Sequence, residues 1–153
     1  MIPKCKMRFL FNWVLVDEIA VGSCPINEGD VIILKKRGIK SILSLCSEDE
    51  VYSKVKISDH FNHKRFILPD HKKNFYPTKS EILTTLNFLN ELKQLGPVFV
   101  HCVASVERSP LICMAWLIKD LNLSPEESLD YMMQIHPSTN PLPQQFSLLK
   151  DLK

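Results

Sequence analysis

The sequence lacks several features that would place it in a specialised class of protein. No apolar run approaches the roughly 18 residues of a membrane-spanning helix. Only four glycines and no internal repeat are present, which excludes collagen-like, solenoid and glycine-linker architectures. The formal net charge is only +2, far from the strongly basic character of most nucleic-acid-binding proteins. We therefore expect no nucleic-acid partner and no membrane span.

The cysteines also lack a recognisable pairing pattern. The chain has five of them, and no two form the C-x-x-C pair of a zinc knuckle or a thioredoxin-type site. Free thiols in a reducing cytoplasm are the simplest interpretation. His60, His63 and His71 follow no trusted zinc-ligand spacing. We expect no metal, no cofactor, a cytoplasmic location and a monomer.

The length of 153 residues predicts a single domain over residues 1–153. A chain of this size buries about 68–70% of its unfolded surface and needs no staple to fold. Its first 16 residues place basic side chains before an apolar stretch, as a signal peptide does. Asn12 interrupts that stretch, and Asp17 and Glu18 close it, so we expect a first strand there instead.

The residue pattern predicts alternating strands and helices. Strands are expected at residues 13–16, 19–22, 40–46 and 98–100, and within 61–68 at the string RFIL. The acidic string SEDE after residue 46 is interpreted as a solvated break. Helices are expected over 27–37, from Thr78 to Gly96, from Ser109 through 121, from Ser124 to His136 and over 144–152. The fold class is therefore α/β, with a central, mostly parallel sheet of about five strands flanked by helices.

One segment combines groups that suit chemistry on a phosphate ester. The string VFVHCVASVERSP places Cys102 directly after a buried strand, and a short loop then leads to Arg108 and a helix start. Loop N–H groups and a helix N-terminus attract anions, and the Arg108 guanidinium matches two phosphate oxygens. The same positive field favours a thiolate at Cys102. A thiolate beneath a bound phosphate is placed for in-line attack on phosphorus.

This string resembles the signature of the cysteine-dependent protein tyrosine phosphatases: His, Cys, five residues, Arg, Ser. The strings WVLVDEIAVGSCP, GIKSILSLC and LPD and the closing HP…P…F resemble their small dual-specificity branch. The resemblance implies that Cys102 is the nucleophile, that Arg108 binds phosphate, that Ser109 helps the thiolate leave and that His101 orders the loop. It also implies phosphate binding by the backbone of Val103, Ala104, Ser105, Val106, Glu107 and Arg108.

The resemblance further implies a general acid upstream of the nucleophile. Asp70 is the candidate, because it follows a strand and lies 32 residues before Cys102 (102 − 70). The alternative is that Asp70 only forms a turn after Pro69, in which case Asp59 would be the substitute. Basic residues surround Asp70 in the sequence and form either a phosphate-attracting rim or a solvated face: Lys64, Arg65, Lys72, Lys73 and Lys79.

Cys46 ends a predicted strand near the same sheet edge as Cys102. In some relatives a cysteine here forms a reversible disulfide with the nucleophile, so a redox partnership is one interpretation. The other is a small buried residue, the common fate of a free cysteine. Cys113 is expected in the core.

Two loop residues depart from the family pattern. Ser105 stands where most relatives have glycine, at a position where a backbone with φ > 0 would strain a serine. Glu107 places a negative charge beside Arg108, where it would repel phosphate if directed inward or select a positively charged substrate if directed outward.

The leading functional hypothesis is a metal-independent phosphomonoesterase acting through a phosphocysteine intermediate. Its partner would be a phosphorylated protein or peptide carrying phosphotyrosine, with phosphoserine and phosphothreonine as further substrates. Two alternatives stay open. One is a phosphopeptide-binding pseudophosphatase, suggested by Ser105 and Glu107, and the other is a phosphatase of a non-protein phosphate ester.

Overall fold

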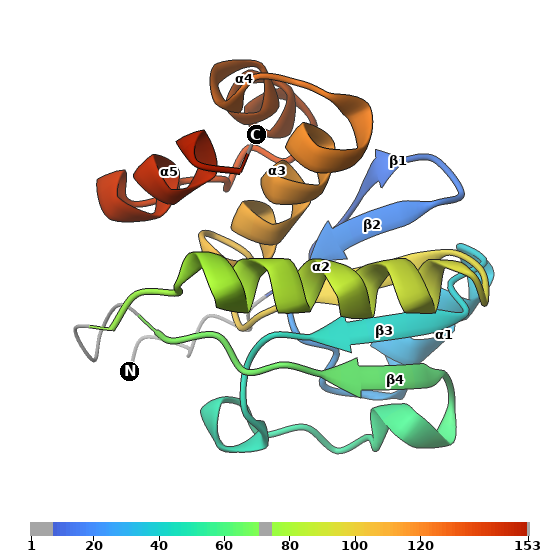
Figure 1. Cartoon of the computed structure of the whole chain (residues 1–153). Coiled ribbons are helices and arrows are strands. Elements are labelled where there is room, and N and C mark those ends of the chain that lie inside the picture. The colour runs from blue at the N-terminus through green and yellow to red at the C-terminus, as the bar shows by residue number, and fades with distance from the viewer. Residues whose placement is uncertain (1–7, 71–74, 153) are drawn as a thin grey trace.

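The computed structural model describes residues 8–70 and 75–152, which build a five-stranded sheet (Figure 1). The sheet order is β1-β2-β5-β3-β4. The hairpin of β1 (Phe11–Leu15) and β2 (Ile19–Gly22) is antiparallel, and every other neighbouring pair is parallel: β2 with β5 (Val98–His101), β5 with β3 (Ser41–Ser44), and β3 with β4 (Asn62–Arg65). The predicted fold class is confirmed.

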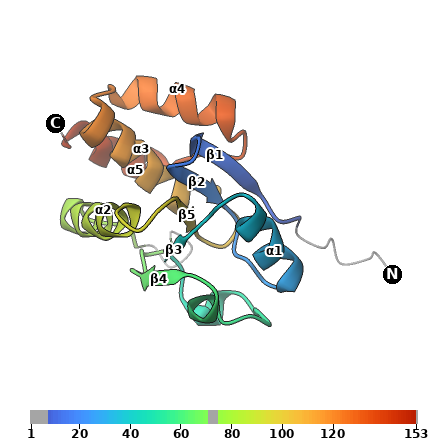
Figure 2. The ribbon, with the colours of Figure 1, turned by 90° about the vertical axis from the view of Figure 1, so that its right-hand side faces the viewer.

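Helices cover both faces of the sheet. On one face lies α1 (Glu28–Lys36), and on the other lie α2 (Lys79–Lys93), α3 (Arg108–Leu121), α4 (Pro125–Ile135) and α5 (Pro143–Lys150) (Figure 2). Two short 3-10 helices, η1 (Glu48–Glu50) and η2 (Ile57–Asp59), connect β3 to β4. In the part of the chain that the structure describes, no helix is both long and apolar enough to span a membrane.

The central strand β5 fills both cores. Its Val98 and Val100 enter the larger core beneath α2 and α3, and its Phe99 enters the smaller core beneath α1. This alternation follows from the two-residue period of a strand. Every residue of β5 is buried, as its apolar sequence predicted. Because β2, β3 and β5 are parallel, their carboxyl ends meet at one edge of the sheet.

Local signals in the sequence set most element boundaries. Thr78 and Ser124 form the predicted capping boxes at the starts of α2 and α4. Asn27 caps α1 by accepting a hydrogen bond from the backbone of Asp30. Gly38 follows α1 at φ +84°, a conformation that glycine adopts without steric cost.

The first strand begins at Phe11, two residues before its predicted start, and the third is Ser41–Ser44 rather than 40–46. Two further differences bear on the site. The fourth strand is Asn62–Arg65 rather than RFIL, although Phe66 and Leu68 still donate backbone hydrogen bonds to β3 and to Leu45 just after it. Helix α3 begins at Arg108, with Glu107 at its N-cap, rather than at a Ser109 cap. Pro110 is tolerated inside the first turn because the N–H groups there have no partner in the helix.

Candidate active site

The segment from Val103 to Arg108, called the phosphate loop below, lines a cavity of about 370 Å³ at the carboxyl edge of the sheet. Its walls bring together most of the residues that the sequence singled out, and Glu50 is the one addition. The lining residues are Glu50, Asp70, Cys102, Val103, Ala104, Val106, Glu107 and Arg108. Ser109 and His101 lie behind the loop and are fully buried. The predicted nucleophile, arginine and acid therefore share one cavity.

Cys102 lies at the floor of this cavity with its side chain 3% exposed. Its Sγ is 3.3 Å from Ser109 Oγ, within hydrogen-bond distance for sulfur. Ser109 belongs to the first turn of α3, where unpaired N–H groups and the helix dipole stabilise a negative charge. The sulfur thus lies within reach of both a hydroxyl and the positive end of a helix dipole.

Ser105 adopts the strained conformation that its position predicted, with φ +59°. Its Oγ lies 2.8 Å from Ser109 Oγ and 2.9 Å from His136 Nε2. Its carbonyl oxygen accepts hydrogen bonds from Ser138 Oγ and His136 Nε2, each at 2.9 Å. The serine is therefore strained where a glycine would not be, but its hydroxyl makes buried hydrogen bonds that hold the loop and that a glycine could not make.

His136 was predicted only as a helix end, yet it is the support of the phosphate loop. Asn12 from β1 donates to its Nδ1 at 2.7 Å, which leaves Nε2 to donate to Ser105. Burial lowers the pKa of His136, and the Ser105 carbonyl only partly offsets this, so the ring is neutral at pH 7. The available signal in the sequence was a histidine at the predicted end of a helix, in the closing HP string that resembles the family.

Glu50 is the functional residue that sequence reasoning missed. It lies in η1, inside the string interpreted as a solvated break, and its carboxylate accepts two hydrogen bonds from Arg108, at 2.8 and 3.2 Å. Burial is the largest single influence on the pKa of Arg108 and lowers it, but the hydrogen bond to Glu50 and the nearby charges of Glu50, Cys102 and Cys46 together outweigh burial and raise that pKa. Burial would likewise raise the pKa of Glu50, and the bonds from Arg108 and Ser47 lower it below its usual value.

The Glu50 contact leaves part of the guanidinium available. Arg108 also donates to the Leu68 carbonyl at 3.3 Å, again through Nη1. Together, Glu50 and Leu68 use three of the five N–H donors within the described ranges 8–70 and 75–152. The Nε–H and one Nη2–H remain, and these two form a planar fork suited to two phosphate oxygens.

Glu107 is 9% exposed and lines the cavity, so its side chain is not directed into open solvent. Asp70 is half-buried and lines the same cavity, as the acid role requires. Its substitute Asp59 is exposed in η2 and is not part of this cavity wall.

Two of the five residues of the proposed basic rim make contacts away from Asp70. Lys64 forms an ion pair with Glu91, and Arg65 donates to the Cys46 carbonyl, so both are engaged elsewhere. Cys5, His71, Lys72 and Lys73 lie outside the described residues.

His101 is completely buried and holds the loop from below. Its Nδ1 lies 2.9 Å from the Cys102 carbonyl oxygen, its Nε2 lies 2.6 Å from Ser44 Oγ, and its ring stacks on Phe99. Ser44 Oγ also lies 2.8 Å from Nε2 of His63. Burial lowers the pKa of His63 to about 4, with a smaller effect of Arg65, so this ring too is neutral at pH 7.

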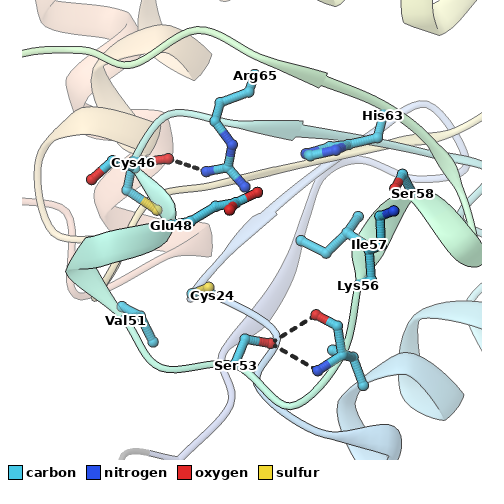
Figure 3. A pocket seen from close by; sticks show the side chains of 12 residues that line it. Cys24, Cys46, Glu48, Val51, Ser53, Lys56, Ile57, Ser58, His63 and Arg65 are labelled. Atoms are coloured by element: carbon cyan, nitrogen blue, oxygen red, sulfur yellow. Dashed lines mark hydrogen bonds between the residues drawn. The ribbon is translucent and has the colours of Figure 1, made fainter.

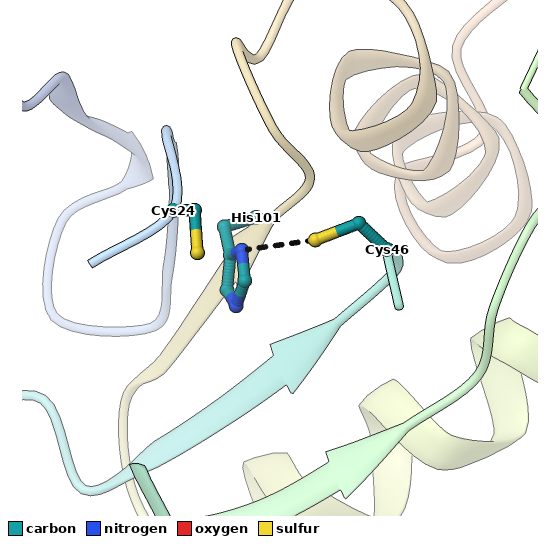
Figure 4. A group of neighbouring side chains, drawn as sticks. All are labelled: Cys24, Cys46 and His101. Atoms are coloured by element: carbon teal, nitrogen blue, oxygen red, sulfur yellow. Dashed lines mark hydrogen bonds between the residues drawn. The ribbon is translucent and has the colours of Figure 1, made fainter. Parts of the chain in front are cut away.

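A second cavity of about 290 Å³ lies beside the first and is lined in part by Cys24 and Cys46 (Figure 3). The Cys46 Sγ is 4.0 Å from His101 Nδ1 (Figure 4). A hydrogen bond from the Cys24 thiol lowers the pKa of Cys46 to about 5, whereas that bond and burial raise the pKa of Cys24. Cys46 is thus buried, as one interpretation held, and the thiol coupled to it is Cys24. Cys113 lies in the core, where burial raises its pKa.

Comparison with known proteins places this geometry in context. Residues 23–152 match the family model described as "Dual specificity phosphatase, catalytic domain". The phosphatidylglycerophosphate phosphatase PTPMT2 of Arabidopsis thaliana is 25% identical over 97% of this chain and 69% of its own length. PTPMT1 of the same plant is 24% identical over 89% of this chain and 41% of its own length.

Solved structures show the same fold. PTPMT1 in complex with PI(5)P superposes with a TM-score of 0.79 at 20% identity, covering 93% of each chain. A human tyrosine phosphatase-like serine/threonine/tyrosine-interacting protein superposes with a TM-score of 0.75 at 18% identity, covering 92% of this chain and 93% of that one. At these identities the likeness concerns the fold alone.

Proposed function

The chain belongs to the dual-specificity phosphatase catalytic-domain family, and we propose that it hydrolyses phosphate monoesters without a metal, through a phosphocysteine intermediate. The observation that carries the proposal is the geometry of one cavity. It places Cys102 Sγ 3.3 Å from Ser109 Oγ and opens beside the free fork of Arg108. This arrangement supplies a nucleophile, an anion clamp and a hydroxyl for the leaving thiolate.

In the first step, the Cys102 thiolate attacks phosphorus and the ester oxygen leaves. The backbone N–H groups of the loop and the Arg108 fork hold the three other oxygens, on which negative charge is spread in the transition state. Asp70 gives a proton to the leaving oxygen, so the alcohol departs neutral. The products of this step are the alcohol, the phosphocysteine and an Asp70 carboxylate.

In the second step, water attacks the phosphocysteine and releases inorganic phosphate. Asp70 takes the proton of this water and returns to its starting state. Ser109 donates a hydrogen bond to the sulfur as the S–P bond breaks and charge returns to it. Glu50 keeps the Arg108 guanidinium in one orientation throughout, which lowers the cost of ordering it on phosphate.

We propose a phosphorylated protein or peptide as the substrate, with phosphotyrosine first. The open cavity supports this, because its wall above Cys102 is formed by short loops that would also admit phosphoserine and phosphothreonine.

A lipid phosphate ester is the second candidate. A neighbouring cavity of about 450 Å³ shares Glu50 and Asp70 with the first, and its rim carries Phe75 and Ile67, which are 65% and 53% exposed. Exposed apolar side chains beside a phosphate site suit an acyl chain or a membrane surface. Relatives named phosphatidylglycerophosphate phosphatases add weight to this candidate.

The experiment compares the wild type with Cys102→Ser on p-nitrophenyl phosphate, a phosphotyrosine peptide and phosphatidylglycerophosphate in vesicles, with EDTA present. We expect activity in the wild type alone. Equal rates for the two proteins would refute the cysteine mechanism. Peptide binding without hydrolysis of any substrate would instead indicate a pseudophosphatase. The ratio of peptide to vesicle rates decides between the two substrate classes.

The acid role of Asp70 is tested with Asp70→Asn. This variant should slow hydrolysis of the peptide about 10²-fold or more, but it should slow p-nitrophenyl phosphate much less, because nitrophenolate leaves without protonation. Steady-state kcat values for both substrates measure the difference. A uniform small loss on both would assign the acid to another residue.

A further inference from the structure

Two thiols that line the second cavity, Cys24 and Cys46, lie close to the buried imidazole of His101, apart from the reacting groups. The Sγ atoms of Cys24 and Cys46 and a ring nitrogen of His101 all lie within 4.8 Å of one another. Cys24 is half-buried, and the other two are fully buried. We propose that these three residues form a binding site for a thiophilic cation, of which Zn²⁺ is the example tested below.

The topology of the sheet explains why the three donors meet. Gly22 at the end of β2 and Ser44 at the end of β3 both pair with His101 at the end of β5. Cys24 and Cys46 each follow their strand end by two residues. The thiols therefore approach His101 from the two strands that flank its own (Figure 4). The pairing register of the sheet is thus what brings the three side chains together.

The spacing suits a bridging cation better than a disulfide. β2 and β3 lie on opposite sides of β5, so their ends are about 9–10 Å apart at the usual strand spacing. A disulfide needs Cα atoms about 4.4–6.8 Å apart, which is closer than these two strand ends. Two thiolates on one tetrahedral zinc, at Zn–S of about 2.3 Å, hold their sulfurs about 3.8 Å apart. Small side-chain rotations reach that separation from the one observed.

The donor set and its surroundings fit zinc chemistry. Two cysteines and one histidine are a known tetrahedral set that leaves the fourth position for water. Both thiols line the cavity, which has room for that water. Lys56 and Arg65 line it too, and Glu48 opposes them, so the local charge is mixed. A dication with two thiolates and a neutral imidazole is uncharged overall and does not conflict with these cations.

Binding would also reach the phosphate loop, a consequence that rests on the proposed phosphatase activity. His101 Nδ1 lies against the Cys102 carbonyl oxygen at 2.9 Å, and a metal at Nδ1 takes the place of that contact. The ring proton then sits on Nε2 and is donated to Ser44 Oγ, which already lies 2.6 Å away and fixes the ring. The two thiol protons are released to solvent. Zinc at this site should therefore inhibit the enzyme reversibly.

The binding test uses Cys102→Ser protein, in which the nucleophile cannot compete for metal. The protein is reduced with a phosphine and titrated with Co²⁺, and sulfur-to-cobalt charge-transfer absorption reports thiolate ligation. We expect one equivalent to bind and Zn²⁺ to displace it. Adding Cys24→Ser or Cys46→Ser should remove the absorption, while adding Cys113→Ala, which removes a distant core thiol, should not.

No absorption in the Cys102→Ser protein, or absorption that survives both cysteine variants, would overturn the proposal. Thermal melting of each variant confirms that it is folded, and Cys24→Ser is the decisive one because this side chain is only half-buried. The readout needs no catalysis, so it is independent of whether the protein is a phosphatase.

The inhibition test uses the otherwise wild-type enzyme. Zn²⁺ should inhibit hydrolysis of p-nitrophenyl phosphate, and a chelator should restore it. Cys24→Ser should keep its basal activity and raise the half-inhibiting Zn²⁺ concentration by at least about tenfold, the loss that even an outer-sphere partner causes. An unchanged concentration would place the inhibiting metal elsewhere, such as on Cys102, and would count against the proposal.

Discussion

Ser105 shows how one residue can be strained and still stabilise its loop. A non-glycine residue at φ +59° costs about 1–2 kcal/mol. The hydroxyl returns part of this through Ser109 and His136, at about 0.5–1.5 kcal/mol per hydrogen bond. A glycine at this position would lose both the backbone strain and the side-chain hydrogen bonds. An alanine would keep the strain and lose only the hydrogen bonds. Ser105→Gly should therefore change the free energy of unfolding little.

Ser105→Ala is the matched variant for this prediction. It keeps the strain and loses the hydrogen bonds, so it should be less stable than Ser105→Gly by about 1–2 kcal/mol. Urea unfolding curves of the two variants and the wild type measure the differences. If alanine proved as stable as glycine, the strain at this position would be negligible.

His63 makes the stability of the protein depend on pH. Its pKa is about 4 in the folded state against about 6.5 when exposed, because burial opposes the charged ring. Below pH 6.5 the unfolded chain takes up a proton that the folded chain refuses, so the unfolded state gains stability. The free energy of unfolding should fall as pH drops from about 6.5 to about 4.

His136 has a lowered pKa as well and contributes in the same direction. His63→Gln should remove the contribution of His63 and flatten the fall, which chemical unfolding at a series of pH values would measure. An equally steep fall in the variant would mean that His63 is not responsible.

The elements differ in how far the sequence determined them. Helix starts marked by Thr78, Ser124 and Asn27 were predictable, because each cap is made by residues within one turn. The start of α3 was not, because the phosphate loop feeds directly into the helix at Arg108 and uses no side-chain cap. The fourth strand was shifted because edge pairing with β3, rather than hydrophobicity, selects Asn62–Arg65.

The cap of α2 gives a prediction at this scale. Thr78 accepts from the backbone of Glu81, and Glu81 returns a bond to the backbone of Thr78. Thr78→Ala should lower the free energy of unfolding by about 0.5–2 kcal/mol. Thr84→Ala, in the interior of the same helix, is the control and should be near neutral because alanine has the higher helix propensity. Equal losses in thermal melts would show that the cap contributes nothing specific.

At the scale of the whole molecule, the parallel sheet gathers distant residues at one edge. The nucleophile, the arginine and the loop could be predicted, because they are contiguous in sequence and follow a recognisable strand. Glu50, His136 and Cys24 could not, because they lie in separate parts of the chain. Glu50 lies in η1, His136 follows α4 and Cys24 follows β2, and only the tertiary fold brings each of them to its partner. The second cavity is connected to the first through His101, which lies beside Cys24 and Cys46 and contacts the Cys102 carbonyl oxygen.

Anion binding should therefore stabilise the entire fold. A phosphate ion would contact the loop, the first turn of α3 and Arg108, which Glu50 ties to the segment after β3. At 100 times its Kd, a ligand of the folded state adds about 2.7 kcal/mol. For a chain of this length, that corresponds to a rise in Tm of about 5–10 °C. Thermal melts in phosphate against chloride at equal ionic strength measure the rise.

Two variants decide whether this rise comes from the proposed site. Cys102→Ser leaves the anion clamp intact and should keep the rise in Tm, because phosphate is held by the loop and not by sulfur. Arg108→Lys keeps the charge but removes the planar fork, and should abolish most of the rise. Sulfate, of the same shape, should act in the same direction as phosphate. Equal rises in Tm in the wild type and both variants would mean that phosphate stabilises the fold through general salt effects. The cavity above Cys102 would then not be an oxyanion site.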